Sequence, residues 1–391
     1  MSPRLTFVVP RYGADVHGGA EQGARTMAIG LAAEGWDVSV LASCGRSHVT
    51  WADSYAPGET EEEGVRVNRF PVESPRPSNF DALSDRLLPR ASQASEPEAL
   101  DWIDQQGPRS EGLLDAVRTV DSGVLAFYPY LYQPTVRGIH LARVPSILHA
   151  ACHPEPPLDL PVFAGVFGSA SALAHHSRAE QELILRRFPS TTGTPQIILG
   201  LPIEVSAPVD PEGAREALGL GSEPFAVTLG RVDRGKGTFD LIDSFSRFRE
   251  TNGGGRLVLA GPVIETPPAT EGVTVLGPVP EEHKYGLLAA ADVLINPSPH
   301  ESFSIVVPEA FLVGTPVLVN GWCLPLREHC ENSGGGLWYT GPADFEVALS
   351  RMLGDGALRA ALAEAGRSYA VRAFSRESVM RRYESLVEQI S

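Results

Sequence analysis

The segment "VTVLGPVPEEHKYGLLAAADVLINPSPHESFSIVVPEAFLVGTPVL", residues 273–318, has the repeating pattern that decides the fold. It alternates short apolar runs with amphipathic stretches of helical spacing. The expected strands are 273–277, 292–298 and 316–320, and the expected helices are 281–291 and 305–313. Nearly continuous apolar strands that alternate with helices indicate a parallel sheet covered on both faces. The segment therefore predicts part of a doubly wound α/β domain.

The same alternation extends toward both ends of the chain. Further expected strands are 5–10, 36–42, 65–72, 124–129, 145–150, 172–177, 196–200, 225–230 and 256–261, and further helices 20–35, 178–188, 238–250 and 375–390. Residues 201–214 contain three prolines and break the alternation, which indicates an interdomain linker. Residues 73–112 are polar and rich in Pro and Ser, which is typical of an insertion or a mobile helical excursion.

The pattern predicts two Rossmann-like domains that face each other across a cleft. The N-terminal domain would span 1–204 and form the acceptor side, and the C-terminal domain would span 205–373. A final helix over 374–391 is expected to pack back on the first domain. Because ligands bind at the carboxyl ends of strands in such sheets, the loops that follow the strands are the candidate functional segments.

Composition excludes several other classes of protein. The 391 residues are enough for two cores, and a formal net charge of −16 argues against a nucleic-acid binder. It argues only weakly against peripheral contact with anionic lipid. No apolar run approaches the ~20 residues of a membrane helix. The apolar run near residue 1 is too short for the hydrophobic region of a signal peptide. We therefore expect a soluble, cytoplasmic protein.

The four cysteines form no CxxC pair. This spacing predicts neither a disulfide framework nor a zinc site, and the bland interpretation is that all four are small buried side chains.

The loop "RYGADVHGGAEQGA", residues 11–24, follows the first expected strand and places Gly18 and Gly19 before a helix. Paired glycines there let backbone amides approach an anion. The spacing is not GxGxxG, and residues 41–44 supply no acid after the second strand, so a dinucleotide site is disfavoured. A flexible strand-to-helix turn is the alternative.

The loop "GRVDRGKGTFD", residues 230–240, follows the first strand of the second half. Arg231 and Lys236 lie five residues apart before a helix that starts near Thr238. Two cations beside free helix amides suit a diphosphate, although the loop does not match the Walker A pattern. A solvated basic turn is the alternative.

The stretch "HESFSIVVPEA", residues 300–310, carries Glu301 and Glu309 on either side of an apolar run. Pro308 lacks an N–H and fits only the first turn of a helix, so we expect no helix much before Ser304. Glu301 then lies on the loop and Glu309 near the helix start. Taken alone, the two acids fit two interpretations equally well. They are either a functional pair, or a helix-start acid and a solvated loop acid without a function.

In combination, these residues resemble the retaining glycosyltransferases of family 4, which have the GT-B fold. The resemblance rests on the E-x7-E pattern of Glu301 and Glu309, on the preceding Arg231 and Lys236, and on the GGAE loop at 18–21. It covers nearly the whole chain and is strongest over 273–318. The strings "GPRSEGLLDAV", "YPYLYQPTVRG" and "HPEPP" are similar to a bacterial branch that makes surface polysaccharides or related glycosides.

The resemblance implies that the second domain holds a nucleotide-sugar donor. Arg231 and Lys236 would bind the diphosphate and stabilise the leaving nucleotide. Glu309 would accept hydrogen bonds from the ribose hydroxyls, and Glu301 would contact the donor sugar, where a carboxylate favours an oxocarbenium-like state.

The resemblance also implies backbone contacts with the donor. The amides of Phe303 and Ser304 would lie near the sugar and phosphate, and the backbone of Val279 would meet the base. Gly18 and Gly19 would close on the diphosphate from the first domain.

His153 falls where the family carries a histidine at the reacting face of the sugar, with a packed histidine as the alternative. Two positions depart from the family pattern. Pro154 stands where the branch commonly has an acid, and Glu155 comes next. Pro308 precedes Glu309 where Leu or a Gly-like residue is usual, which the first helical turn tolerates.

The implied activity is transfer of a hexosyl group from UDP-hexose or GDP-mannose to a glycan, lipid-linked or small-molecule acceptor. Neither a metal nor another cofactor is implied, because Arg231 and Lys236 would neutralise the diphosphate and no DxD motif is present. A GT-B-like sugar-nucleotide epimerase and a non-catalytic nucleotide-sugar-binding subunit or sensor are the alternatives.

Overall fold

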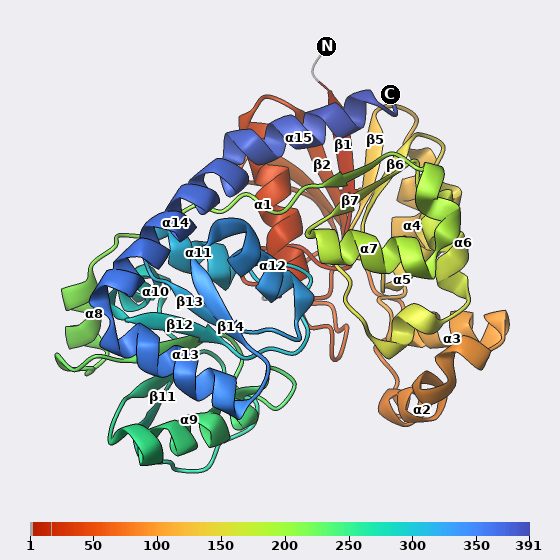
Figure 1. Ribbon diagram of the computed structural model, residues 1–391. Helices are drawn as coiled ribbons and strands as arrows, with labels where there is room; N and C mark the ends of the chain where they lie inside the picture. The colour runs from red at the N-terminus through yellow and green to blue at the C-terminus, as the bar shows by residue number, and fades with distance from the viewer. Residues whose placement is uncertain (1–2, 17) are drawn as a thin grey trace. The chain divides into compact units, whose positions relative to one another are not determined.

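The computed structural model describes residues 3–16 and 18–391, and the chain divides into two compact units. Unit 1 comprises the residues up to Pro202 together with Val379–Ser391, and unit 2 comprises Ile203–Ser378. Each unit has a central sheet of mainly parallel strands with helices packed against it (Figure 1). The prediction of two doubly wound α/β domains is confirmed.

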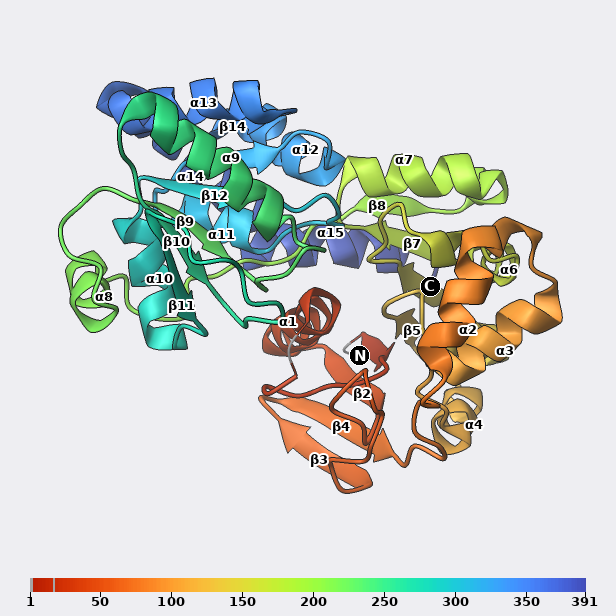
Figure 2. The same ribbon diagram turned by 90° about the horizontal axis from the view of Figure 1, so that it is seen from below.

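The sheet of unit 1 has eight strands in the order β3-β4-β2-β1-β5-β6-β7-β8. The strands are β1 (Arg4–Val8), β2 (Asp37–Ser43), β3 (Gly58–Glu62), β4 (Val65–Phe70), β5 (Val124–Phe127), β6 (Ser146–His149), β7 (Ala172–His175) and β8 (Gln196–Ile198). All neighbours are parallel except β3 and β4, which form an antiparallel hairpin at one edge (Figure 2). The sequence analysis missed β3, because its residues GETEE are polar and largely exposed and carry no apolar alternation.

Seven α-helices accompany this sheet in the described part of unit 1 before its final segment. They are α1 (Gly19–Ala33), α2 (Phe80–Leu87), α3 (Glu96–Gln106), α4 (Glu111–Thr119), α5 (Gln133–Gly138), α6 (Val162–Ser169) and α7 (Arg178–Arg187). Residues 73–112 thus contain α2, α3 and the start of α4. This agrees with the helical character of the predicted excursion. Phe80, Trp102 and Ile103 from this segment are buried in the core of the unit. A capping box between Ser95 and Glu98 starts α3.

The sheet of unit 2 has six parallel strands in the order β11-β10-β9-β12-β13-β14. The strands are β9 (Ala226–Leu229), β10 (Leu257–Ala260), β11 (Val273–Gly277), β12 (Val293–Asn296), β13 (Val317–Asn320) and β14 (Gly336–Tyr339). The direction of strand addition reverses between β9 and β12. In open α/β sheets, the carboxyl ends at such a switch point form the usual ligand site.

The helices of unit 2 lie on both faces of its sheet. They are α8 (Pro211–Ala217), α9 (Thr238–Asn252), α10 (Glu281–Ala290), α11 (Val306–Leu312), α12 (Leu324–Ser333), α13 (Pro342–Gly354) and α14 (Gly356–Phe374). On one face, Phe245 of α9 and Phe345 of α13 join the buried cluster beneath the strands. The expected linker at 201–214 ends earlier than predicted, because Asp210 caps α8 and Pro211 occupies its first position.

The last helix, α15 (Arg376–Glu388), brings the chain back into unit 1, to which Val379–Ser391 belong. The buried hydroxyl of Tyr383 lies 3.0 Å from Nε2 of His149, at the end of β6. Tyr128 stacks on the same imidazole, and its hydroxyl lies 2.7 Å from Nε2 of His176. The helix therefore packs on a buried cluster of histidine and tyrosine side chains.

We expect this cluster to make unit 1 sensitive to acid. Burial lowers the pKa of His149 well below its ordinary value, and lowers the pKa of His175 from 6.5 to about 4 and that of His176 from 6.5 to about 3. Below pH 6.5 the unfolded chain then binds protons that the folded chain does not. Each group lowers the free energy of unfolding by about 1.4 kcal/mol per pH unit in that window.

Burial raises the pKa of Glu155, so this one carboxyl group raises the free energy of unfolding as the pH falls. The three histidines act in the opposite direction. Thermal unfolding measured from pH 7 to pH 5 should therefore show a falling midpoint. An unchanged midpoint over this range would contradict the assignment of neutral, buried histidines.

Within the described residues, no helix combines the length and the apolar character that a bilayer-crossing segment requires. The four cysteines are buried, which agrees with their interpretation as small buried side chains.

Candidate functional site

The loop after β9 is shaped by the buried carboxylate of Asp233. Its Oδ1 accepts a hydrogen bond of 2.7 Å from the backbone N–H of Lys236, and its Oδ2 lies 3.3 Å from Nε of Arg231. One carboxylate thus fixes the turn and holds the guanidinium at its mouth. Sequence analysis did not single out Asp233; the only signal was an acid between two bases in a glycine-punctuated loop.

Lys236 and Glu301 form an ion pair at the switch point of the sheet. Lys236 Nζ lies 2.7 Å from Glu301 Oε1, and the side chains are 32% and 17% exposed. This contact is the only hydrogen bond of the Glu301 carboxylate to the described residues, so Oε2 has no protein partner among them. The adjacency of β9 and β12 in the sheet therefore brings a cation and a carboxylate together.

Gly237 explains how closely the two loops approach. It has a φ of +74°, and a Cβ there would lie 2.5 Å from the carbonyl oxygen of Pro297 in the loop after β12. Only glycine combines this left-handed conformation with the close contact.

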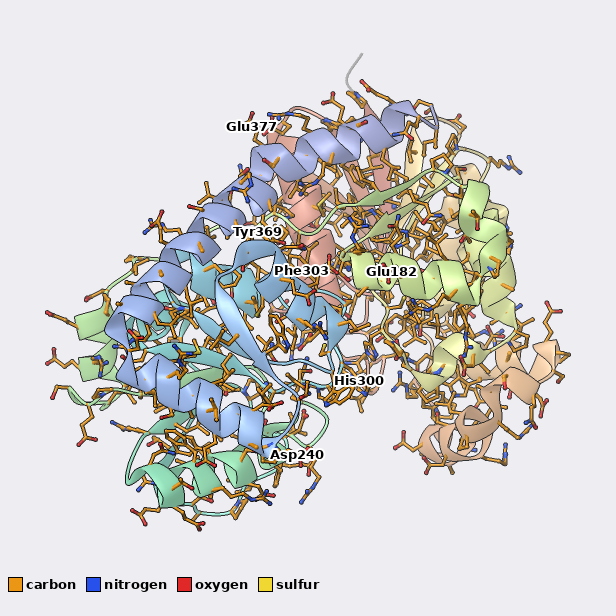
Figure 3. The ribbon with its side chains drawn as sticks, viewed as in Figure 1. Glu182, Asp240, His300, Phe303, Tyr369 and Glu377 are labelled. Atoms are coloured by element: carbon orange, nitrogen blue, oxygen red, sulfur yellow. The ribbon has the colours of Figure 1, made fainter. Side chains whose placement is uncertain are left out.

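The loop after β12 is held in a tight conformation up to α11. Ser304 has a φ of +72°, and its hydroxyl accepts a hydrogen bond of 2.9 Å from Asn296. The buried imidazole of His329 lies 2.8 Å from the carbonyl oxygen of Phe303, and burial lowers its pKa to about 4, so the neutral ring donates through Nε2. Figure 3 labels Phe303 and His300 on this loop. Since α11 begins at Val306, the expected loop-then-helix arrangement is confirmed.

Glu309 is buried in the first turns of α11, with only 3% of its surface exposed. Its Oε1 lies 2.6 Å from Lys284 Nζ and accepts a hydrogen bond of 3.3 Å from the Tyr285 hydroxyl. Burial raises the pKa of Glu309, and the ion pair with Lys284 opposes that rise. Both contacts converge on Oε1, which leaves Oε2 without a hydrogen bond to the described residues. Sequence analysis missed Lys284 and Tyr285, because the packing of α10 on α11 is not readable from the chain.

Val279 lies half-buried between β11 and α10, at the same carboxyl edge of the sheet as the ion pair. It is separated from β9 by β10 alone in the strand order. Seven of the predicted site residues are thus in unit 2: Arg231, Lys236, Val279, Glu301, Phe303, Ser304 and Glu309.

Gly18, Gly19 and His153 belong to unit 1. Gly18 and Gly19 are exposed at the start of α1, and beneath them the buried Arg11 and Glu21 form an ion pair of 2.7 Å. A Cβ on Gly18 would overlap Oε2 of Glu21, so glycine leaves room for that buried, ion-paired carboxylate. Sequence analysis did not foresee this buried pair.

His153 is half-buried on the loop after β6, with Nε2 3.9 Å from Glu155 Oε1. Burial raises the pKa of Glu155, and His153 and the hydroxyl of Tyr130, at 2.9 Å, oppose the rise. The buried carboxylate of Glu180 fixes the same loop by accepting the backbone N–H of Cys152 at 2.7 Å. His153 is therefore neither packed in the core nor fully exposed.

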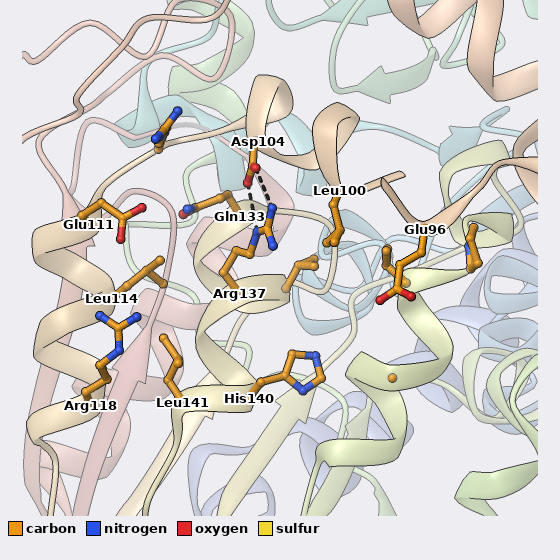
Figure 4. Close-up of a pocket in the computed structure, with 15 residues that line it drawn as sticks. Glu96, Leu100, Asp104, Glu111, Leu114, Arg118, Gln133, Arg137, His140 and Leu141 are labelled. Atoms are coloured by element: carbon orange, nitrogen blue, oxygen red, sulfur yellow. Dashed lines mark hydrogen bonds and ion pairs between the residues drawn. The ribbon is translucent and has the colours of Figure 1, made fainter. Parts of the chain in front are cut away.

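Unit 1 also contains a pocket of about 650 Å³ between α3, α4, α5 and α6 (Figure 4). Arg137 and Asp104 form a two-point ion pair across it, at 3.1 and 2.6 Å. None of the site residues predicted from the sequence lines this pocket. Its charges are of both signs, and it supports no specific chemistry by itself.

Replacing Asp233 by Ala should both destabilise unit 2 and weaken anion binding at the loop. The change leaves the backbone N–H of Lys236 without its acceptor and releases Arg231, which costs about 1–3 kcal/mol of unfolding free energy. Chemical denaturation and calorimetric titration with UDP would measure the two effects. Glu265→Ala is a matched control, because Glu265 is a half-exposed acid that pairs with Arg234 of the same loop. Equal effects of the two changes would contradict the role given to Asp233.

Comparisons with known proteins show what the chain is similar to. Residues 212–369 match the family described as "Glycosyl transferases group 1". The D-inositol 3-phosphate glycosyltransferase of Xylanimonas cellulosilytica is 28% identical over 340 residues, which cover 78% of each chain. That of Nocardia farcinica is 32% identical over 170 residues, which cover 38% of this chain and 37% of that protein. The second match thus spans little more than a third of that relative's length.

Solved structures share the fold at low sequence identity. Sucrose-phosphate synthase from Thermosynechococcus elongatus aligns with a TM-score of 0.72 and 19% identity over 99% of this chain and 98% of that chain. Anabaena HepE in complex with UDP and glucose aligns with a TM-score of 0.70 and 16% identity over 99% and 100%. The chain therefore has the two-domain GT-B fold, and its residues 212–369 match the family described as "Glycosyl transferases group 1".

Proposed function

We propose that this protein is a retaining, metal-independent hexosyltransferase. It moves a hexosyl group from a UDP-hexose, with GDP-mannose as the second candidate donor, to a glycan, lipid-linked or small-molecule acceptor. The observation that carries the proposal is the ion pair of Lys236 and Glu301 at the switch point of the unit 2 sheet. It joins a cation suited to a diphosphate with a carboxylate suited to a sugar.

Lys236 and Arg231 bind the diphosphate of the donor. When the bond to the sugar breaks, negative charge grows on the leaving nucleotide, and preorganised cations stabilise that charge. Asp233 holds the Lys236 backbone and the Arg231 guanidinium in place before the donor arrives. Two fixed cations supply the charge neutralisation that a divalent metal gives in other transferases, so we expect activity in the presence of EDTA.

Glu301 and Glu309 contact the sugar and the ribose. Each carboxylate uses only Oε1 for its hydrogen bonds within the described residues. Each therefore has Oε2 to accept a hydroxyl of the donor. Burial of Glu309 disfavours its ionised form, and the positive charge of Lys284 beside it offsets this effect. The ion pair supports an ionised Glu309 as the acceptor for the ribose hydroxyls.

Backbone groups complete the donor site. Ser304 adopts a positive φ in the turn before α11. The amides of Phe303 and Ser304 bind the sugar and phosphate, and the backbone of Val279 meets the base. Gly18 and Gly19 contribute amides to the diphosphate from the start of α1. His153 hydrogen-bonds a hydroxyl of the transferred sugar, with Glu155 beside its Nε2.

The ligands and names of the similar proteins indicate which donor and which acceptor to test first. HepE is described in complex with UDP and glucose, which supports UDP-glucose as the first donor to test. The relatives are named D-inositol 3-phosphate glycosyltransferases, which supports a cyclitol phosphate as the first acceptor.

The decisive experiment combines donor binding with turnover. UDP-glucose, UDP-galactose, GDP-mannose, dTDP-glucose and ADP-glucose are compared by thermal shift in EDTA. A donor at 100 times its Kd should stabilise the protein by about 2.7 kcal/mol. Nucleotide release is then measured with D-inositol 3-phosphate and simple glycosides, and NMR of the anomeric proton assigns retention.

Two results of this experiment would contradict the proposal. Binding of a donor without nucleotide release, with or without these acceptors, would indicate the non-catalytic nucleotide-sugar-binding subunit. Absence of binding by every nucleotide sugar would overturn the donor site itself.

A further inference from the structure

Trp322 is the most exposed large apolar side chain in the described part of the molecule, with 73% of its surface accessible. It follows β13, and its position is nevertheless fixed. The indole Nε1–H donates a hydrogen bond of 2.9 Å to the carbonyl oxygen of Thr340, and the backbone N–H donates one of 3.0 Å to Asn320 Oδ1. A tryptophan whose polar N–H is satisfied by the protein presents a rigid aromatic face.

The Trp322 loop is tied to the loop that carries Glu301. Asn320 Nδ2 donates a hydrogen bond of 3.2 Å to the carbonyl oxygen of Pro297, the same residue against which Gly237 packs. The next residue, Cys323, is buried, and backbone groups of Glu301 and Leu326 lie beside its thiol. The loops that bear Lys236, Glu301 and Trp322 therefore meet around Pro297.

The order of strands places Trp322 beyond the sugar position. From one side of the sheet to the other, the loops of β11, β9, β12 and β13 carry Val279, Lys236, Glu301 and Trp322. In the proposed function these loops meet the base, the diphosphate and the transferred sugar in that order. The next place in the row is open to the molecule that receives the sugar.

We infer that Trp322 is a stacking platform for a sugar or cyclitol ring of the acceptor. The inference rests on the proposed function, because that function gives the neighbouring loops their ligands. One face of such a ring consists mainly of C–H groups, which pack on the electron-rich face of an indole. The hydroxyls at the ring edge remain available to solvent and to polar neighbours.

A ring ligand fits this surface better than a membrane or an apolar protein segment. The indole offers one flat face, held by two hydrogen bonds, beside a charged pair. Leu324, two residues later, is also 51% exposed. A lipid surface would use both side chains, whereas a stacked ring depends on the aromatic face alone. Substitutions at Trp322 and at Leu324 therefore distinguish a stacked ring from a lipid surface.

The test uses methyl α-D-glucopyranoside, methyl β-D-glucopyranoside and myo-inositol as probes, with and without saturating UDP. Saturation-transfer NMR on the wild-type protein should show transfer to the C–H protons of one ring face of at least one probe. Trp322→Ala should weaken this binding by about tenfold or more, and Trp322→Phe should restore part of it. Leu324→Ala should bind the probes as the wild type does.

UDP affinity, measured by calorimetry on every variant, shows that the fold and the donor site are intact. Absence of UDP binding by the wild-type protein would refute the proposed donor. Binding of a probe that depends on Trp322 in the absence of UDP would still support the stacking platform. No transfer to any probe, or equal transfer to the wild type and Trp322→Ala, would overturn it. Binding to phosphatidylglycerol vesicles that falls equally in Trp322→Ala and Leu324→Ala would overturn it in favour of a lipid surface.

Discussion

Lys236→Ala is expected to lower the turnover of the UDP-sugar donor by about 100- to 1,000-fold, the range for removing one preorganised group that stabilises transition-state charge. The effect has two sources. The leaving diphosphate loses a cation, and Glu301, 2.7 Å from Lys236 Nζ in the native protein, loses its counter-ion. The unpaired carboxylate then repels the diphosphate. UDP affinity should therefore fall together with turnover.

Arg234→Ala is the matched control for this change. Arg234 lies two residues before Lys236, is 71% exposed at its side chain and pairs with Glu265. Removing it takes the same charge from the same loop without touching Glu301. Calorimetry with UDP and a nucleotide-release assay on both variants would decide the matter. Unchanged UDP affinity in Lys236→Ala would refute its role in holding the diphosphate.

Glu301→Gln should separate binding from turnover in opposite directions. Turnover of the UDP-sugar should fall about 100-fold, because an amide stabilises positive charge on the sugar less than a carboxylate does. UDP alone should bind as tightly as to the wild type or more tightly, because Lys236 no longer shares its charge with an acid 2.7 Å away. Calorimetry with UDP and the release assay measure these two quantities on one sample.

Glu265→Gln serves as the control for Glu301→Gln. It neutralises a half-exposed acid that pairs with Arg234 rather than with Lys236. A large loss of UDP affinity in Glu301→Gln would mean that the acid organises the loop rather than contacting the sugar. Unchanged turnover would remove Glu301 from the reaction. In the double variant Lys236→Ala/Glu301→Gln, the effects should be non-additive, since the two side chains are in contact.

The sequence predicted the α/β fold, and the sheet edge that carries the candidate site of unit 2, for a physical reason. Parallel buried strands have apolar runs that stand out, and the carboxyl ends of such strands share one edge. Loops after β9 and β12 therefore had to lie at the same edge once both strands were recognised. That β9 and β12 are neighbours, and that Lys236 pairs with Glu301, is seen only in the structure.

Other features could not be predicted because they depend on packing between distant segments. Lys284 pairs with Glu309 only because α10 lies against α11, and Asp233 acts through a turn conformation that no spacing specifies. Neither the hairpin strand β3 nor β14 was predicted; β3 has no buried face, so the pattern that revealed most of the strands is missing there. Arg11 and Glu21 were hidden for the opposite reason, because charged residues are rarely expected inside.

The return of the chain to unit 1 after Ser378 has a consequence for how the protein is made. Unit 2 is one continuous stretch, whereas unit 1 is assembled from two stretches that the ribosome produces at different times. Unit 2 has all of its residues before unit 1 gains Tyr383, the partner of His149. A chain truncated after Ser378 should then show a protease-resistant unit 2 and leave the β6 region of unit 1 more readily cleaved. Unit 1 matures last although its synthesis begins first.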